Sequence, residues 1–208
     1  MSIHQNGRFL VPAIGATLVL GAALAMTAVF SFSEPRSGLA VQDRNEQIAQ
    51  IRELYAQVQE RIARAVKEAE AGSPPEFYST EIFVNRHNGS WRASGTYSKK
   101  TVFWYTDQPE FAGEEAGGEL SVLVKIEIEE IVAVRAYYRE FLFDKGKLVF
   151  AFIKNPGETG TAEEFRYYFS DGALIRYMEG QRIVERKNDT TALEAEVKTL
   201  RALFLSTF

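Results

Sequence analysis

One β-hairpin pattern occurs twice between residues 136 and 178, and this repeat constrains the fold more than any other feature of the sequence. Each copy is an aromatic run, a turn that contains Asp and Gly, and a second apolar run. Glycine adopts positive φ without steric cost and aspartate tolerates it, so Asp171-Gly172 predicts a tight hairpin turn. The longer Asp144–Lys147 turn is expected to hold Gly146 in the left-handed conformation. The stretch therefore predicts four antiparallel strands in a row.

The alternation of side chains along these strands indicates what surrounds the sheet, because successive residues point to opposite faces. From 137 to 143, one face is expected to carry Tyr137, Arg139, Phe141 and Phe143, and the other Tyr138, Glu140 and Leu142. From 148 to 153, Leu148, Phe150 and Phe152 are expected opposite Val149, Ala151 and Ile153. A strand that is apolar on both faces is usually covered twice. The second face must therefore be covered as well, and the sequence offers two helices.

A long amphipathic helix is predicted at 43–71, ahead of the strands. Asp43 and Glu46 have the spacing of a capping box, and apolar residues then recur at steps of three and four. The apolar stripe consists of Ile48, Ile51, Tyr55, Val58, Ile62, Ala65 and Ala69. Such a helix is about 40 Å long, whereas a strand of seven residues spans about 23 Å, so its start is expected to overhang the sheet. We interpret it as a helix that lies on the sheet, with a stalk or dimerisation helix as the alternative.

The remaining strands are predicted between residues 77 and 134. Phe77–Asn85, Trp91–Tyr97 and Lys99–Thr106 have strand character, with Asn88-Gly89 as a hairpin corner. In the next run, Val122, Val124, Ile126 and Ile128 alternate with Leu123, Lys125, Glu127 and Glu129. Glu130 breaks this alternation, and a bulge or turn near 129–131 is expected to restore it.

An uncharged run of 24 residues, Phe9–Phe32, lies near the N-terminus. About 20 residues suffice for a helix to span the hydrocarbon layer. The run is longer than a signal-peptide core of about 7–15 residues, which favours an uncleaved single-pass anchor. The small-residue sequence Ala23-Leu24-Ala25 favours a secretory signal that is removed near residue 25. Both interpretations place the rest of the chain outside the cytoplasm, in the periplasm or at the cell surface.

Together these elements predict an α+β fold in three parts. Residues 1–33 form the transmembrane anchor or signal peptide, and 34–42 form a linker. Residues 43–208 form an extracytoplasmic domain. Its elements are helix 43–71, an antiparallel meander of about seven or eight strands over 77–186, and a C-terminal helix over 190–206. The apolar face of the last helix consists of Leu193, Val197, Leu200 and Phe204.

Composition and motifs narrow the possible functions. The formal net charge is −4, which argues against a nucleic-acid partner, because such a partner needs a basic face. The chain has no Cys, so a disulfide framework, a thiolate metal site and a cysteine nucleophile are excluded. The sequence shows no nucleophile elbow, phosphate loop, dinucleotide fingerprint or paired-His zinc motif, and its two histidines are His4 and His87. We therefore expect no cofactor, no metal and no catalysis.

Carboxylates are the remaining candidates for chemistry. Glu127, Glu129 and Glu130 lie close together in the sequence, as do Glu163 and Glu164. Paired carboxylates serve glycoside hydrolysis or hold a hard cation, whereas carboxylates on solvated strand faces pair with basic residues opposite them. We favour the second interpretation. The expected pairs join Arg135, Arg139, Arg166 and Arg176 to Glu127, Glu140 and Glu164.

Exposed aromatic side chains are the stronger functional candidates. Amphipathic rings suit binding surfaces and partner interfaces. The alternative is that they line the two faces of the sheet beneath the helices. The candidate binding surface consists of Trp91, Trp104, Tyr137, Tyr138, Arg139, Tyr167, Tyr168 and Tyr177.

The first hairpin resembles those of a group of uncharacterised bacterial exported proteins. The likeness lies in the aromatic-rich run, the turn and the Gly-Lys-Leu sequence of Tyr137–Leu148, YYREFLFDKGKL. The resemblance covers about Phe77–Tyr177. It implies an exported antiparallel sheet domain and carries over no catalytic residue.

We therefore expect a non-enzymatic extracytoplasmic binding or accessory protein of a bacterial envelope, which includes a subunit of a membrane complex. It is expected to hold a protein partner, or a second copy of itself, through helix 43–71 or the aromatic sheet face. Phe9–Phe32 contacts the membrane if it is not cleaved. The alternatives are a carrier of a small apolar ligand between sheet and helix, and a carboxylate-based hydrolase.

Overall fold

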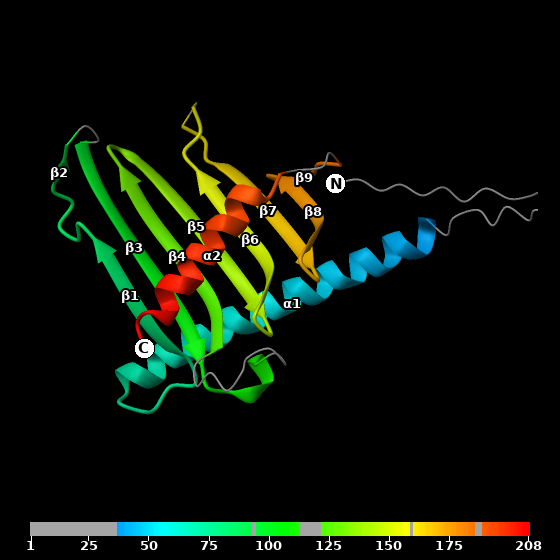
Figure 1. Cartoon of the computed structure of the whole chain (residues 1–208), viewed down its shortest axis with the longest axis horizontal. Coiled ribbons are helices and arrows are strands. Elements are labelled where there is room, and N and C mark those ends of the chain that lie inside the picture. The colour runs from blue at the N-terminus through cyan, green and yellow to red at the C-terminus, as the bar shows by residue number, and fades with distance from the viewer. Residues whose placement is uncertain (1–36, 93–94, 113–121, 159, 186–188) are drawn as a thin grey trace, which may run out of the picture. The chain divides into compact units, whose positions relative to one another are not determined.

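A nine-stranded antiparallel sheet with one helix on each face makes up the described part of the chain (Figure 1). The computed structural model describes residues 37–92, 95–112, 122–158, 160–185 and 189–208. The predicted anchor or signal segment Phe9–Phe32 lies outside these residues. The structure confirms the predicted α+β class, the antiparallel sheet and the C-terminal helix.

The strands follow the chain in an almost unbroken meander. The helices are α1 (Ser37–Glu70) and α2 (Thr191–Leu205), and Pro109–Phe111 form one 3-10 turn, η1. The strands are β1 (Tyr78–Val84), β2 (Ser90–Trp91), β3 (Gly95–Thr106), β4 (Val122–Val132), β5 (Arg135–Asp144), β6 (Lys147–Asn155), β7 (Glu163–Ser170), β8 (Ala173–Glu179) and β9 (Arg182–Ile183). The sheet order is β1-β3-β4-β5-β6-β7-β8-β9, and β2 pairs only with β3.

Helix α1 begins at Ser37 rather than at Asp43, so most of the predicted linker is helical. The added residues include Leu39, Ala40 and Gln42, which favour a helix. The stripe from Ile48 to Ala65 is buried as predicted, except that Tyr55 is partly exposed, and Ala69 is exposed. Residues 41–47 are all exposed, and Figure 1 shows the start of α1 extending past the β8 edge of the sheet. The predicted overhang is therefore confirmed.

The two hairpin turns of the repeat have the expected conformation. Lys145 and Gly146 have φ of 48° and 77°, and Asp171 and Gly172 have φ of 48° and 76°. Positive φ at both central residues is the signature of a turn that matches the twist of antiparallel strands. The region before β4 differs from prediction: β3 runs unbroken to Thr106, where two strands were expected, because its pairing with β4 continues across residue 98.

A β-bulge in β4 changes the predicted faces of that strand. Trp104 pairs with Lys125 and Tyr105 pairs with Leu123, so Val124 is the extra residue. The bulge places Val122, Val124, Lys125 and Glu127 on the α1 face and Leu123, Ile126 and Ile128 on the α2 face. The bulge predicted near 129–131 is wrong, because pairing with β5 continues there without a shift. Similar shifts at Val149 and Ile175 turn these two side chains toward α1.

Each face of the sheet has its own core. The α1-face core contains Ile48, Ile51, Val58, Ile62, Ala65, Phe77, Phe111, Val122, Val124, Leu142, Phe150, Tyr168 and Met178. The α2-face core contains Phe103, Leu123, Ile126, Ile128, Phe141, Phe143, Ala151, Phe169, Leu193, Val197, Leu200 and Phe204. The sheet is thus covered twice, as the doubly apolar strands predicted.

Candidate functional site

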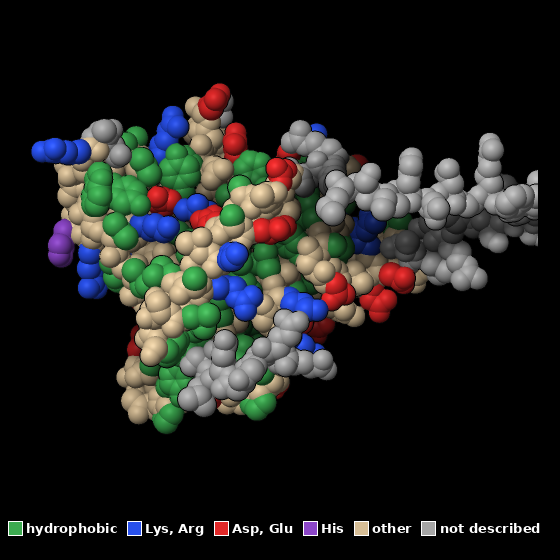
Figure 2. Space-filling view, in the orientation of Figure 1, with side chains coloured by type: hydrophobic (Ala, Val, Ile, Leu, Met, Phe, Trp, Pro, Cys, Tyr) green, Lys and Arg blue, Asp and Glu red, His purple; other side chains and the backbone are tan. Residues whose placement is uncertain are grey.

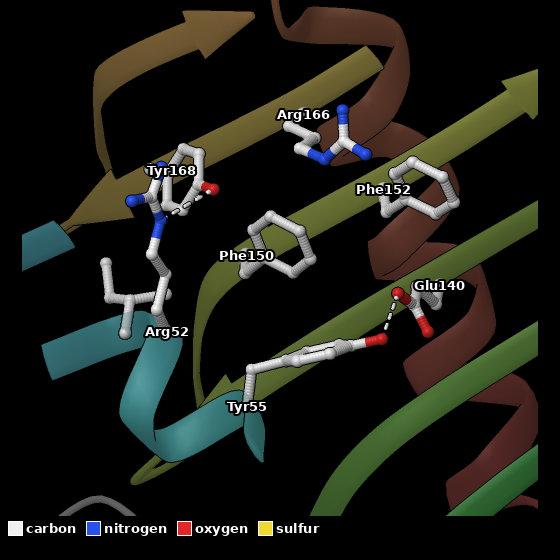
Figure 3. Close-up of a pocket in the computed structure, with 8 residues that line it drawn as sticks. Arg52, Tyr55, Glu140, Phe150, Phe152, Arg166 and Tyr168 are labelled. Atoms are coloured by element: carbon white, nitrogen blue, oxygen red, sulfur yellow. Dashed lines mark hydrogen bonds between the residues drawn. The ribbon is translucent and has the colours of Figure 1, made fainter. Parts of the chain in front are cut away.

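A groove lies between α1 and strands β5, β6 and β7, on the α1 face of the sheet (Figure 3). Its volume is about 260 Å³. The groove is lined by Ile51, Arg52 and Tyr55 of α1, Glu140 of β5, Phe150 and Phe152 of β6, and Arg166 and Tyr168 of β7. This volume lies just below the ~300–1,000 Å³ typical of sites for drug-sized ligands, so the groove suits a small molecule.

Strand register builds the sheet side of the groove. Glu140 lies opposite Phe152, and Phe152 lies opposite Arg166, so one cross-strand row presents a carboxylate, a ring and a guanidinium to α1. The Arg166 guanidinium lies over the Phe152 ring, at 5.0 Å from its centroid. Phe150 is two residues along from Phe152 on the same face, and its ring contacts Tyr55 at 5.5 Å and Tyr168 at 5.1 Å. The floor of the groove is therefore aromatic.

A buried ion-pair network closes one end of the groove. Lys125 is fully buried, and its Nζ lies 2.7 Å from Glu127 Oε1 and 2.8 Å from Glu140 Oε2. Glu127 and Glu140 are directly opposite each other on β4 and β5. Like charges in that position repel, and the ammonium between them offsets the repulsion. The indole Nε1 of Trp104 also donates to Glu127 Oε2, at 3.2 Å.

Two tyrosine hydroxyl groups complete the shell around Glu140. Tyr55 Oη donates to Glu140 Oε1 at 2.8 Å, and Tyr138 Oη donates to Glu140 Oε2 at 3.0 Å. Gln59 Nε2 in turn donates to Tyr55 Oη at 2.8 Å. Burial, followed by the charge of Glu140, raises the pKa of Tyr55 to about 12. The same two causes raise the pKa of Tyr138 further, so both hydroxyl groups stay protonated donors at neutral pH.

Two arginine side chains border the groove. Arg52 is exposed on α1; its Nε donates to Tyr168 Oη at 3.3 Å, and its guanidinium lies 5.6 Å from the centre of that ring. Arg166 is held more firmly, since Nη2 contacts Glu164 Oε2 at 2.7 Å and Nη1 donates to the Gly180 carbonyl at 2.8 Å. The groove thus has a carboxylate, an aromatic floor and a cationic rim.

The eight residues of the predicted binding surface do not form one surface. Trp104, Tyr138 and Tyr168 lie on the α1 face, and Tyr168 alone of these lines the groove. Tyr137, Arg139, Tyr167 and Tyr177 lie on the α2 face. Trp91 lies on β2, is half exposed and packs against Tyr97 at 5.5 Å. Because successive side chains of a strand point to opposite faces, neighbouring aromatic residues are divided between the two faces of the sheet.

The carboxylates that are close in sequence are also separated. Glu127 and Glu129 face α1, whereas Glu130 faces α2 and pairs with Arg139 at 2.6 Å. The predicted pairs were cross-strand pairs, whereas Arg166 pairs with Glu164 along the same strand, β7. Arg139 instead joins Glu130 and Glu196, and Arg176 donates to Asn45. Across the described residues, no group of three His, Asp or Glu is arranged to hold a metal ion.

Four residues central to this site were not recognised from the sequence: Tyr55, Lys125, Glu140 and Arg52. Lys125 carries a usable signal, because a single lysine within the apolar run 122–128 must find a buried counter-charge. Tyr55 carries another, since it is a hydroxyl-bearing residue in a buried helical stripe and needs a partner. Glu140 and Arg52 have no such signal, because their roles depend on where α1 crosses the sheet.

Comparisons with protein-family models, with curated proteins and with solved structures give no match to this chain. Within the described ranges, none of the helices combines the length and apolar character needed to cross a membrane. The interpretation of function therefore rests on the residues and geometry of the molecule itself.

Proposed function

We propose that this protein is a non-enzymatic extracytoplasmic binding protein of a bacterial envelope, and that the groove between α1 and β5–β7 holds a small ligand. The observation that carries the proposal is the groove itself, with its aromatic floor and its buried charged end. Ligand sites typically combine an apolar lining with a few fixed polar groups. Glu140 is held by three donors, which supports a role in orienting a ligand rather than in transferring a proton.

The extracytoplasmic location is part of the proposal and rests on Phe9–Phe32, together with the resemblance of Tyr137–Leu148 to exported proteins. Either an anchor or a signal peptide at that position delivers the domain across a membrane. A binding protein placed there samples small molecules outside the cytoplasm.

Native mass spectrometry of the protein isolated from its own membranes in mild detergent tests the proposal. We expect a constant additional small mass on the chain. Arg52→Trp fills the groove from an exposed helical position and should remove this mass. Arg64→Trp, at an exposed position of the same helix outside the groove, should retain it. A ligand-free chain, or a mass that both variants keep, would contradict the assignment of the groove. The mass of the chain also reports whether a segment near residue 25 has been removed.

A second candidate function is that of an accessory subunit that holds a protein partner through the start of α1. The observation that favours it is the overhang: residues 41–47 are exposed around the whole helix, and Val41 is 51% exposed. Val41 is the one apolar residue of this stretch, so a partner would be held mainly by polar and charged side chains such as Arg44. The same mass spectra distinguish the two candidates, because a bound subunit adds a protein mass that an Arg44→Glu substitution should remove and Arg52→Trp should not.

A further inference from the structure

Glu140 has hydrogen-bonding capacity that the protein does not use. A carboxylate offers about four acceptor positions. Oε2 accepts from Tyr138 Oη and from Lys125 Nζ, whereas Oε1 accepts from Tyr55 Oη alone. Oε1 therefore has room for one further donor, and the side chain lines the groove.

The charge of the network indicates which kind of donor fits Oε1. Glu127 and Glu140 share the single ammonium group of Lys125, so the cluster carries one excess negative charge. Glu140 is 4% exposed, whereas the Glu127 side chain is 24% exposed, so any part of the excess charge that is carried by Glu140 is costly. A cationic donor in the groove would neutralise the cluster, whereas a hydroxyl group would not. The chemistry at this end of the groove thus favours an ammonium group.

The other end of the groove favours an anion. In the part of the chain that the structure describes, no carboxylate lies within ion-pair distance of Arg52. Of its three guanidinium nitrogens, only Nε donates a hydrogen bond within these ranges, which Tyr168 Oη accepts. Arg166 differs, because Glu164 already balances its charge. The terminal nitrogens of Arg52 match a carboxylate in a bidentate geometry.

Phe150 lies between these two ends (Figure 3). A ligand that reaches both ends must carry its ammonium and its carboxylate on opposite sides of an apolar body. A free α-amino acid carries both charges on one carbon and does not span Phe150. A short peptide carries them at its two termini, with side chains between them.

We propose that the groove binds a short unmodified peptide of about two residues, a size set by its volume. The N-terminal ammonium donates to Glu140 Oε1, an apolar side chain packs on Phe150, and the C-terminal carboxylate binds Arg52. This inference names the ligand class of the proposed binding function and rests on it.

Calorimetric titration of the full chain with alanyl-phenylalanine tests the inference. N-acetylation of this dipeptide removes the ammonium group, and C-amidation removes the carboxylate. We expect each modified form to bind at least about tenfold more weakly than the free dipeptide, since each loses a charge-assisted hydrogen bond. Free phenylalanine should also bind at least about tenfold more weakly. Equal affinity of the free and N-acetylated dipeptides would overturn the inference.

The variant Arg52→Gln tests whether Arg52 binds the C-terminal carboxylate of the dipeptide. In this variant the free and C-amidated dipeptides should bind alike, while N-acetylation should still weaken binding. Arg64→Gln serves as the matched control, because Arg64 is exposed on the same helix and pairs with Glu60 outside the groove. An equal loss of C-terminal preference in both variants would show that Arg52 is not the carboxylate partner.

A neutral probe separates this inference from the proposed function. Indole should bind the aromatic floor without using either charged end. If indole binds the unmodified protein but not Arg52→Trp, and no form of the dipeptide binds, the small-molecule function stands and the peptide assignment is wrong. If neither indole nor dipeptide binds, both are wrong.

Discussion

The two faces of the sheet are built from the same strands but differ in what they bury. The α2 face buries a core of apolar residues, with large rings at Phe103, Phe141 and Phe204, and the uncharged Thr101 is buried beside them. The α1 face buries Lys125 and Glu140 beside its apolar core, and it carries the groove. Charged pairs of the α2 side, such as Arg139–Glu196, are partly exposed, and Figure 2 shows charges of both signs scattered over that side.

This difference suggests that the α2 face of the sheet serves mainly stability, whereas the α1 face also serves binding. A buried ion pair is weak evidence for stability, because apolar residues of similar volume often do as well. The α2 face shows that apolar residues fill this sheet without difficulty. The charges on the α1 face are therefore better explained by the ligand that they would orient, which is the basis of the proposed function.

The largest expected effect is that of removing Lys125. Lys125→Met leaves the buried Glu140 opposite the partly exposed Glu127 with no counter-charge between them, and should lower the free energy of unfolding by about 3–5 kcal/mol. Urea denaturation measures this loss. The triple variant Lys125→Met, Glu127→Leu and Glu140→Leu should recover most of it, because no charge then remains unpaired. A loss below about 1 kcal/mol for Lys125→Met would remove the contrast between the faces.

Truncation on the other face should affect stability alone. Phe204 is 2% exposed and its ring packs on Phe103 and Tyr105 at 5.7 Å and 5.4 Å. Phe204→Ala should cost about 3 kcal/mol of unfolding free energy through the cavity that it leaves. Dipeptide affinity, measured below the unfolding transition, should not change. A change in affinity that matched the loss of stability would show that the two faces are coupled.

Alkaline pH should weaken the interactions that Tyr55 makes on the α1 face. Tyr55 has an ordinary pKa of 10.0 and a pKa of about 12 in the folded protein, so the folded state binds this proton more tightly than the unfolded state. Its contribution to stability is therefore complete below pH 10 and is lost as the pH rises toward 12. Tyr55→Phe should cost about 1–2 kcal/mol at neutral pH and reduce this alkaline loss.

Denaturation curves between pH 8 and about 11.5 measure the alkaline effect. Tyr78→Phe is the matched control, because Tyr78 is 39% exposed and lies on the edge strand β1, away from the groove. The control should lose stability with pH as the unmodified protein does. An identical slope for Tyr55→Phe would mean that Tyr55 does not supply the effect.

The sequence predicts the residues of the α2 face more completely than those of the α1 face, which carries the buried charges. Phe141 and Phe143 were assigned to one face and Leu142 to the other by alternation alone, and the structure confirms this. Lys125 was placed opposite Val124, but the bulge at Val124 puts both on the α1 face. One unpaired residue reverses every later assignment in a strand, and the amino-acid pattern does not reveal where it occurs.

The candidate site was harder to predict for a related reason. Its members come from α1, β4, β5, β6 and β7, and they meet only because α1 crosses the sheet at one angle. Local periodicity gives the buried stripe of α1 but not the strand that each residue meets. Of the eight residues of the predicted binding surface only Tyr168 lines the groove, because strand alternation distributes the aromatic side chains over both faces.

The smallest expected effect is that of breaking the partly exposed ion pair between Arg139 and Glu196 on the α2 side. Arg139 Nη1 lies 2.9 Å from Glu196 Oε1, and both side chains are more than 20% exposed, at 22% and 28%. Glu196→Ala should change the free energy of unfolding by about 0–1 kcal/mol, because solvent screens such pairs and Arg139 keeps Glu130. Glu140→Ala should cost about 3–5 kcal/mol, because Lys125 then loses one of two partners in a fully buried position.

The same pair of variants at two salt concentrations sharpens the comparison. Raising the salt from 0.1 M to 1 M shortens the screening length from about 10 Å to about 3 Å. The small effect of Glu196→Ala should then disappear, whereas that of Glu140→Ala should persist, since buried charges are screened much less. If the stability loss caused by Glu140→Ala depended on salt, water would reach the ion pairs of Lys125. The charges on the α1 face would then be screened like the Arg139–Glu196 pair on the α2 side.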